Sequence, residues 1–195
     1  MGTTDFVALD FETANYSQHS VCAIALVDVR GGQATDTYYR LCRPEPNRYT
    51  FTHIHGIARR DTDHQPTFAA LWPEMLPRID GRLLVAHNAP FDIGVLRATV
   101  HHYGLPAPDL RYLCTLQMAR RATKLRGVTL SNYRLPTVAT HYGYRDFTHH
   151  QALADAQACA HIFLQIQREL GITTEGQLAT ALGSKPKDLH GVGHA

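Results

Sequence analysis

The first residues that indicate chemistry are Asp10 and Glu12, the only Asp-x-Glu sequence in the chain. They follow the apolar run Phe6–Leu9, which is typical of a strand covered on both faces. Residues two apart in a strand point to the same face, so these two carboxylates would lie side by side and repel each other. A hard divalent cation such as Mg²⁺ or Mn²⁺ prefers oxygen ligands and would resolve that repulsion. The alternative is a strand end in solvent, with both carboxylates hydrated.

A third carboxylate, Asp92, follows the short apolar segment 83–86 in the sequence HNAPFD. Pro90 suits the first turn of a helix, and Gly104 would end that helix after Tyr103. Asp92 then lies in the first helical turn, where the helix dipole stabilises a carboxylate even without a function. The turn between a strand and a helix at the carboxyl end of a sheet is also where α/β proteins place their sites.

A fourth carboxylate, Asp155, lies near the start of a long helical pattern over residues 151–170, which Gly171 ends. Asp155 falls on the apolar stripe of this helix, and a carboxylate on a core-facing stripe needs a partner. Stabilisation by the helix dipole is the alternative. The stripe consists of Ala152, Ala156, Cys159, Phe163, Ile166 and Leu170.

A histidine, His150, precedes Asp155 by five residues and falls at or just before the first turn of that helix. An imidazole with a pKa of about 6.5 is suited to deprotonating a water molecule. The neighbouring His149 is the other candidate for this role. A solvated surface histidine is the interpretation that involves no function.

The elements that must position these side chains alternate along the chain. Three strands come first, without a helix between them, and the dipeptide Gly31-Gly32 is typical of a hairpin. The later segments alternate helix and strand, which predicts parallel strands beside the antiparallel ones. We therefore expect an α/β fold with a mixed five-stranded sheet and helices on both faces. The expected strands are 5–13, 21–29, 35–42, 83–86 and 112–115, and the expected helices are 67–76, 90–103, 116–124, 136–142, 151–170 and 175–182.

Three motifs in this order resemble the DEDDh (DnaQ-like) 3′–5′ exonuclease family. They are Asp-x-Glu on the first strand, His-Asn-x-x-Phe-Asp after a later strand, and His-x-Ala-Leu-x-Asp opening a terminal helix. The phrase LDFETAN is similar to stand-alone members of the DNA polymerase III epsilon (proofreading) type, and residues 54–57 and 84–88 also match the family. The resemblance covers residues 5–170 and implies a ribonuclease-H-like fold. We expect an exonuclease domain over residues 1–171, followed by a short helix and tail over 172–195.

The resemblance also implies a mechanism. Asp10, Glu12, Asp92 and Asp155 would hold two divalent ions, Mg²⁺ or Mn²⁺, and His150 would take a proton from the attacking water. Water would hydrolyse the terminal phosphodiester bond of a single-stranded nucleic acid 3′ end and release a nucleoside 5′-monophosphate. The terminal nucleotide would bind to residues named by the family pattern: Thr13, Ile54, His55, His87, Asn88 and Phe91. The chain has Tyr16 near the first motif, as a candidate wedge against the penultimate base.

Composition narrows the function classes. The net charge of +2 excludes a histone-like polycation, so any nucleic-acid contact must be local. The four cysteines include no Cys-x-x-Cys pair, which argues against a zinc knuckle or a thioredoxin-type motif. The sequence shows neither a long apolar run nor a signal-peptide pattern, so we expect a cytoplasmic protein without a membrane span.

Several alternatives remain open from the sequence. The enzyme could trim RNA, as oligoribonuclease does, because contacts to the 2′-hydroxyl cannot be placed from the sequence. A non-catalytic module that recruits a polymerase is less favoured, since all five catalytic positions are filled, and DNA polymerase III subunits are the candidate partners. The basic stretch of Arg120, Arg121, Lys124 and Arg126 would either track a single strand or simply stabilise a helix C-terminus.

Overall fold

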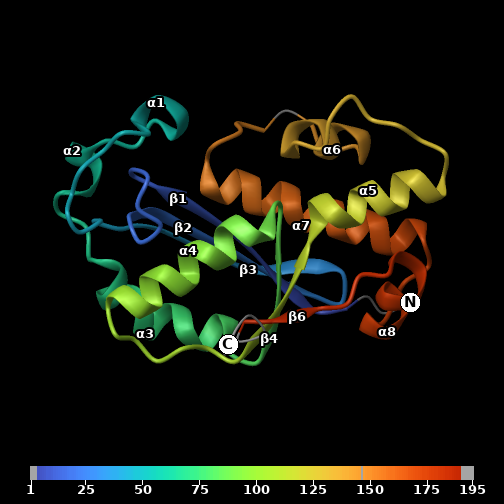
Figure 1. Ribbon diagram of the computed structural model, residues 1–195, viewed down its shortest axis with the longest axis horizontal. Helices are drawn as coiled ribbons and strands as arrows, with labels where there is room; N and C mark the ends of the chain where they lie inside the picture. Colours follow the sequence, from blue (N-terminus) through green and yellow to red (C-terminus); the bar gives the residue numbers. More distant parts are fainter. Residues whose placement is uncertain (1–3, 146, 190–195) are drawn as a thin grey trace, which may run out of the picture.

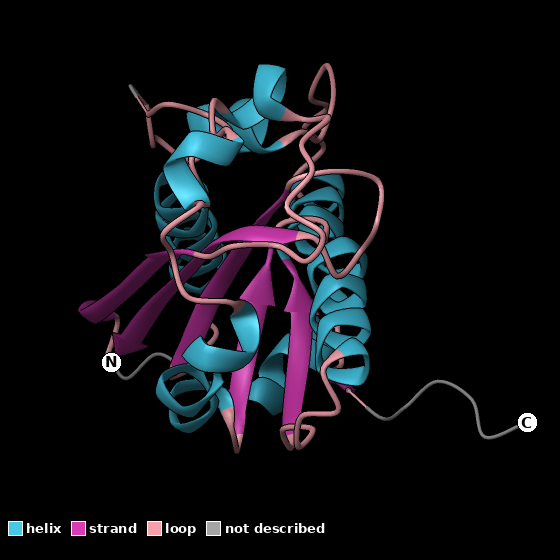
Figure 2. Ribbon diagram, turned by 90° about the vertical axis from the view of Figure 1, so that its left-hand side faces the viewer, coloured by secondary structure: helices cyan, strands magenta, loops and turns pink. Residues whose placement is uncertain are grey.

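A computed structural model describes residues 4–145 and 147–189, and its centre is a six-stranded mixed sheet with the order β3-β2-β1-β4-β5-β6. Helices cover both faces of the sheet (Figures 1 and 2). The strands are β1 (Phe6–Thr13), β2 (Val21–Arg30), β3 (Gln33–Leu41), β4 (Arg82–Ala86), β5 (Leu110–Cys114) and β6 (Lys187–Asp188). The helices are α1 (Thr52–His55), α2 (Arg59–Thr62), α3 (Phe68–Ile79), α4 (Ala89–His102), α5 (Thr115–Leu125), α6 (Leu135–His141), α7 (Ala152–Glu169) and α8 (Glu175–Leu182).

Strand β1 lies in the middle of the sheet. It pairs with β2 in the antiparallel sense and with β4 in the parallel sense, so its backbone is hydrogen-bonded on both edges. Except for Asp10, every residue of β1 is buried. This confirms the expectation from the apolar run, because a strand buried on both faces needs apolar residues at successive positions.

The two faces of the sheet carry separate hydrophobic cores. On one face, Phe6 and Ala8 of β1 pack in a cluster with α5, α6, α7 and α8. On the other face, Val7, Leu9 and Phe11 pack in a cluster with α3 and α4. The alternation of side chains along a strand therefore places Asp10 and Glu12 on the α7 face, beyond Ala8.

Helix α7, with 18 residues, buries Ala156, Cys159, Phe163 and Ile166 of its predicted stripe. Its neighbour α8 packs into the same core through Leu178 and Leu182. In the described parts of the chain, no helix combines the length and the apolar character that a bilayer crossing requires.

One prediction about the fold is wrong, and two short helices were not predicted. The strand count of five is one too low, because the tail contributes β6, which pairs with β5 in the antiparallel sense. Sequence patterning missed β6 because its two residues are exposed and its pairing depends on backbone groups, such as the Leu189 N–H that donates to the Leu110 carbonyl at 3.0 Å. The helices α1 and α2 were also not predicted, since four residues are too few to show a helical period.

Candidate active site and metal centre

Three elements bring the predicted acids together at the carboxyl end of β1. Asp10 and Glu12 lie on the same face of β1, opposite Ala25 and Ala23 of β2. The small alanine side chains leave space above this part of the sheet. Ligand oxygens of Asp10, Glu12 and Asp155 lie within 4.8 Å of one another, which is close enough to share a cation.

Asp92 reaches the cluster from the opposite side of the sheet. It is buried in the first turn of α4, as predicted, and Pro90 lies at the start of that helix. The Phe11 N–H of β1 donates to Asp92 Oδ1 at 3.2 Å, which fixes the carboxylate beside the Asp-x-Glu motif. Asn88, in the left-handed conformation with φ 65°, turns the chain from β4 into α4.

Asp155 comes from the first turn of α7 and is 4% exposed. The His150 N–H donates to Asp155 Oδ2 at 3.0 Å, and His149 Nδ1 donates to the same oxygen at 2.9 Å. The rings of His149 and His150 stack, with their centroids 3.8 Å apart. His149 is therefore the histidine in side-chain contact with the acid, while His150 is exposed, at a left-handed backbone position with φ 67°.

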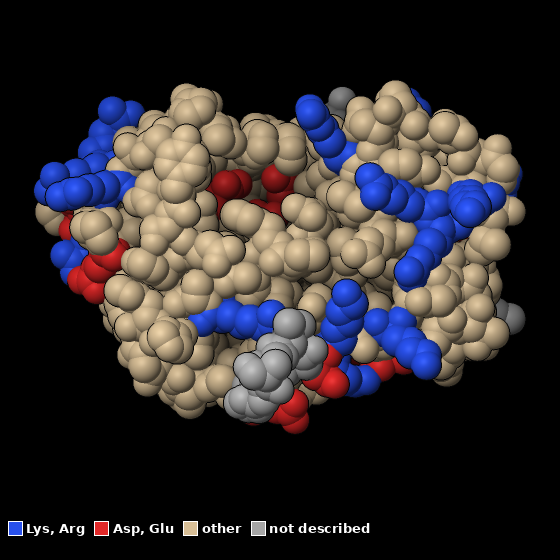
Figure 3. All heavy atoms as spheres, viewed as in Figure 1, with Lys and Arg blue, Asp and Glu red and all other residues tan. Residues whose placement is uncertain are grey.

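The acids lie at the floor of a cavity of about 900 Å³, visible as the dark red patch in the hollow of Figure 3. Every predicted site residue lines this cavity except Asp92, which is buried beside Phe11. In the part of the chain that the structure describes, none of the four carboxylates pairs with lysine or arginine. The site therefore concentrates negative charge without a protein cation to balance it.

This arrangement disfavours ionisation of the carboxyl groups. Burial, together with the charges of Asp92, Glu12 and Asp155, raises the pKa of Asp10 well above its ordinary value. Burial and the charges of Asp155 and Asp92 raise the pKa of Glu12 to about 8. Burial also raises the pKa of Asp92 to about 8, although the Phe11 N–H opposes this shift. A bound cation would oppose each shift, because a nearby positive charge stabilises the ionised carboxylate.

Donor chemistry and spacing together fit a hard divalent cation. The cluster offers carboxylate oxygens from β1 and α7, and oxygen is the ligand that Mg²⁺ and Mn²⁺ prefer. A second group, His149, His150 and Asp155, also has its ligand atoms within 4.8 Å. Since nitrogen ligands suit Zn²⁺ better than Mg²⁺, the all-oxygen group is the better fit for the predicted metals.

Two further histidines are held as neutral rings in the cavity wall. His55 Nε2 donates to the Thr13 carbonyl at 3.1 Å, and its Nδ1 accepts from the Ile57 N–H at 3.1 Å. His87 Nε2 donates to the Tyr133 carbonyl at 3.0 Å, and its Nδ1 contacts the Thr115 hydroxyl at 2.9 Å. Burial lowers the pKa of His55, and it lowers that of His87 to about 4. To a bound nucleotide, these rings would provide shape and apolar contact rather than charge.

The rim of the cavity is apolar. Ile54 and Phe91 are 41% and 43% exposed, so their side chains are available to a ligand. Phe51 also lines the cavity, and the exposed Tyr16 packs edge-on against it with centroids 4.7 Å apart. This contact places Tyr16 next to the rim.

Sequence reasoning missed part of the lining. Besides Phe51, the missed residues are Phe11, Leu116, Asn132, Arg134, Leu135, Pro136 and Thr137. Among the described residues, Arg134 is the one lysine or arginine in this lining. No local pattern identifies these residues, because α6 and the segment before it reach the cavity only through the tertiary fold.

The chain is similar to known exonucleases in sequence and in fold. Residues 7–163 match the RNase_T family model, which describes an exonuclease. The chain belongs to this family. Within it, this DEDDh-type exonuclease domain is 32% identical over 179 residues to the DNA polymerase III PolC-type protein of Thermotoga maritima, a match that covers 88% of the chain and 13% of that protein. It is 28% identical over 174 residues to the 3′-5′ exonuclease DinG of Bacillus subtilis, covering 87% of the chain and 18% of DinG. The chain thus spans only a small part of these relatives.

Solved structures show the same architecture. Exonuclease X in complex with 5′ overhanging duplex DNA is 26% identical, with a TM-score of 0.70, over 91% of this exonuclease domain and 99% of that chain. The E. coli ExoI–ssDNA complex has a TM-score of 0.71 at 16% identity, over 87% of this chain and 41% of that one. The second likeness concerns the fold alone. The predicted ribonuclease-H-like architecture is confirmed.

Proposed function

We propose that this domain is a metal-dependent 3′–5′ exonuclease that removes nucleotides from single-stranded DNA ends and releases nucleoside 5′-monophosphates. The observation that carries the proposal is the cluster of Asp10, Glu12 and Asp155 at the floor of a large cavity, with Asp92 held beside it by the Phe11 N–H. Among the described residues, none of these four acids pairs with lysine or arginine. The family match and the likeness to the DNA-bound exonuclease X support it.

In this proposal Asp10, Glu12, Asp92 and Asp155 hold two divalent ions, Mg²⁺ or Mn²⁺. Such ions neutralise the charge of a phosphodiester. They also lower the pKa of a water molecule, so that it can lose a proton near neutral pH and attack the phosphorus. The carboxylates would hold the ions in fixed positions, because β1 is part of the sheet and α4 and α7 pack on its two faces.

The remaining residues act on the nucleotide and the proton. Burial and the neighbouring His149 lower the pKa of His150, so its imidazole is neutral at pH 7 and able to accept a proton from water. Phe91 presents a ring on which a base can stack irrespective of its identity. Thr13, Ile54, His55, His87 and Asn88 complete the nucleotide pocket, and the Arg134 guanidinium at its edge offers a positive charge to a phosphate.

The test uses an oligonucleotide that carries a label at its 5′ end and a free 3′-hydroxyl. With Mg²⁺ or Mn²⁺ the labelled strand should shorten one nucleotide at a time, and the released product should be a nucleoside 5′-monophosphate. Chelation of the metal should stop the reaction. A matched RNA oligonucleotide distinguishes the DNA enzyme from an RNA-trimming one. Persistence of the full-length strand with both metals would contradict the proposal, and association with DNA polymerase III subunits stays a prediction.

A further inference from the structure

A second cleft lies beside the active-site cavity. It has a volume of about 290 Å³ and is formed by the start of α4, by β5, by α5 and by the segment that joins α8 to β6. Its charged lining residues are Arg121, Lys185 and Lys187, and no acid of the described residues lines it. Neither the family motifs nor the proposed catalytic residues include this cleft.

The two cavities share a wall. Phe91 and Leu116 line the active-site cavity, whereas their chain neighbours Pro90 and Gln117 line the second cleft. The first turns of α4 and α5 therefore separate the two spaces. A strand whose 3′ end occupies the active site and which leaves across Phe91 and Leu116 would pass directly into the second cleft.

The cleft belongs to the most cationic part of this face. All three lysines of the chain, Lys124, Lys185 and Lys187, come from α5 and from the segment after α8. Gln117, Arg121 and Lys124 are spaced by four and three residues, so they share one face of α5. In Figure 3 the lysine and arginine side chains gather over α5 and below it, on the same face as the acidic hollow.

These cations are also available to a ligand. Within residues 4–145 and 147–189, none of the lysines or Arg121 has a carboxylate at ion-pair distance, whereas Arg111 and Arg126 pair with Glu175 and Glu169. Arg121 is held in place by hydrogen bonds from Nη1 to the Gly183 carbonyl at 2.9 Å and to the Ser184 hydroxyl at 2.8 Å. These bonds position the guanidinium without neutralising its charge.

We propose that the second cleft binds the phosphodiester backbone of the substrate strand, on the 5′ side of the nucleotides held in the active site. This inference rests on the proposed function, because it needs a strand whose 3′ end lies among the four acids. Lys185 and Lys187 attract the phosphates, and Arg121 holds the segment 183–184 against α5. The contact is independent of base sequence, as contacts to phosphates are.

The test compares the wild type with the double variant Lys185→Ala/Lys187→Ala. Both side chains are exposed, so their truncation should leave the fold intact. Substrates are the p-nitrophenyl ester of thymidine 5′-monophosphate, a dinucleotide, and single-stranded oligonucleotides of increasing length. We expect kcat to stay unchanged for all of them, and KM to rise on the order of tenfold at about 0.1 M salt only for strands long enough to reach the cleft.

The salt dependence gives a second measure. Each phosphate contact to a single strand contributes about 0.7 to the slope of log affinity against log salt concentration. Loss of both lysines should therefore reduce that slope by about 1.4 for long strands. The matched control is Arg60→Ala/Arg168→Ala, which removes two exposed cations that line neither cavity and should leave KM unchanged.

The outcomes separate this proposal from the proposed function. Equal KM values for variant and wild type at every length would overturn the second site while leaving the exonuclease intact. An equal rise of KM for the ester, or in the control variant, would also overturn it. Inhibition of ester hydrolysis by inorganic phosphate that disappears in the double variant would assign the cleft to free phosphate instead. If the wild type cleaves nothing, the proposed function fails, and fluorescence anisotropy of a labelled strand still measures whether the lysines bind nucleic acid.

Discussion

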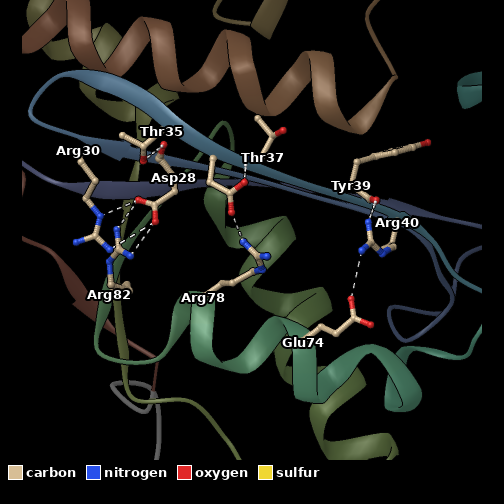
Figure 4. A network of polar contacts seen from close by, with 10 residues as sticks. Asp28, Arg30, Thr35, Thr37, Tyr39, Arg40, Glu74, Arg78 and Arg82 are labelled. Atoms are coloured by element: carbon tan, nitrogen blue, oxygen red, sulfur yellow. Dashed lines mark hydrogen bonds and ion pairs between the residues drawn. The ribbon is translucent and has the colours of Figure 1, made fainter.

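Asp28 on β2 and Asp36 on β3 lie against arginines, whereas the four acids at the carboxyl end of β1 lie against one another. Asp28 accepts from Arg82 at 2.9 Å and from Arg30 at 3.0 Å, and the neighbouring ion pairs join α3 to β3 (Figure 4). Burial pushes the pKa of Asp28 upward, but the hydrogen bonds from Arg82 and Arg30 outweigh it and leave that pKa below its ordinary value. The hydrogen bond from Arg78 similarly lowers the pKa of Asp36.

This difference distinguishes a structural carboxylate from a functional one in this fold. Asp36 links β3 to α3 through Arg78, and Asp28 links β2 to β4 through Arg82. Each of these acids has a guanidinium beside it and ionises readily. Where Asp10, Glu12 and Asp92 converge, no lysine or arginine of the described residues pairs with them, and burial together with the neighbouring acids raises their pKa values. Strongly shifted pKa values of this kind cluster at functional sites.

The largest effect should come from replacing an acid of the cluster. Asp10→Asn should reduce the rate of nucleotide release by about 10³-fold, because it removes charge stabilisation at the reacting phosphate. Asp28→Asn is the matched change in the arginine-paired region and should alter this rate little. Single-turnover rates on a 3′-hydroxyl oligonucleotide measure both. An Asp10→Asn enzyme with the rate of the wild type would remove Asp10 from the site.

The next effect distinguishes the two stacked histidines. His150→Ala should lower kcat by about 10²-fold or more if His150 is the general base, and His149→Ala should lower it less. The opposite ranking would assign the proton transfer to His149, which is the ring that contacts Asp155. The pH dependence of kcat in each variant provides the check, because loss of the base removes its ionisation from the acidic limb.

The pH dependence of stability should have opposite signs in the two regions. Unfolded acids titrate near pH 4, but the folded pKa values of Glu12 and Asp92 are about 8, so their contribution to stability is present below pH 4 and is lost as pH rises towards 8. Without metal, Glu12→Gln should therefore raise the melting temperature relative to the wild type, and more at pH 8 than at pH 5. Thermal unfolding with a chelator measures this difference. A difference that is constant across this range would contradict the raised pKa values.

The smallest effect concerns the paired acids. Arg82→Met should lower the free energy of unfolding by about 1–2 kcal/mol, since it removes a charge-assisted contact between largely buried groups. This corresponds to a few degrees in melting temperature, without a change in kcat. Arg78→Met breaks a more exposed pair and should cost less. A larger loss of unfolding free energy in Arg78→Met than in Arg82→Met would show that the exposure of an ion pair does not determine its contribution to stability.

Sequence reasoning succeeded where the signal is local. The apolar run before Asp10, Pro90 before Asp92 and the stripe around Asp155 each place a carboxylate on its element, and the structure brings all three to one place. Their catalytic roles, and the boundary of the domain at residue 171, stay predictions. The lining by Arg134 and the cleft around Lys185 could not be predicted, because they depend on how α6 packs on α7 and how the tail pairs with β5.

The most direct test of the acid cluster is anomalous diffraction from crystals of the protein soaked with Mn²⁺ and a nucleoside 5′-monophosphate. The account predicts two peaks among Asp10, Glu12, Asp92 and Asp155, about 3.5–4 Å apart, with the nucleotide phosphate beside them. Peaks confined to His149 and His150, or no peak within coordination distance of the four carboxylates, would contradict it.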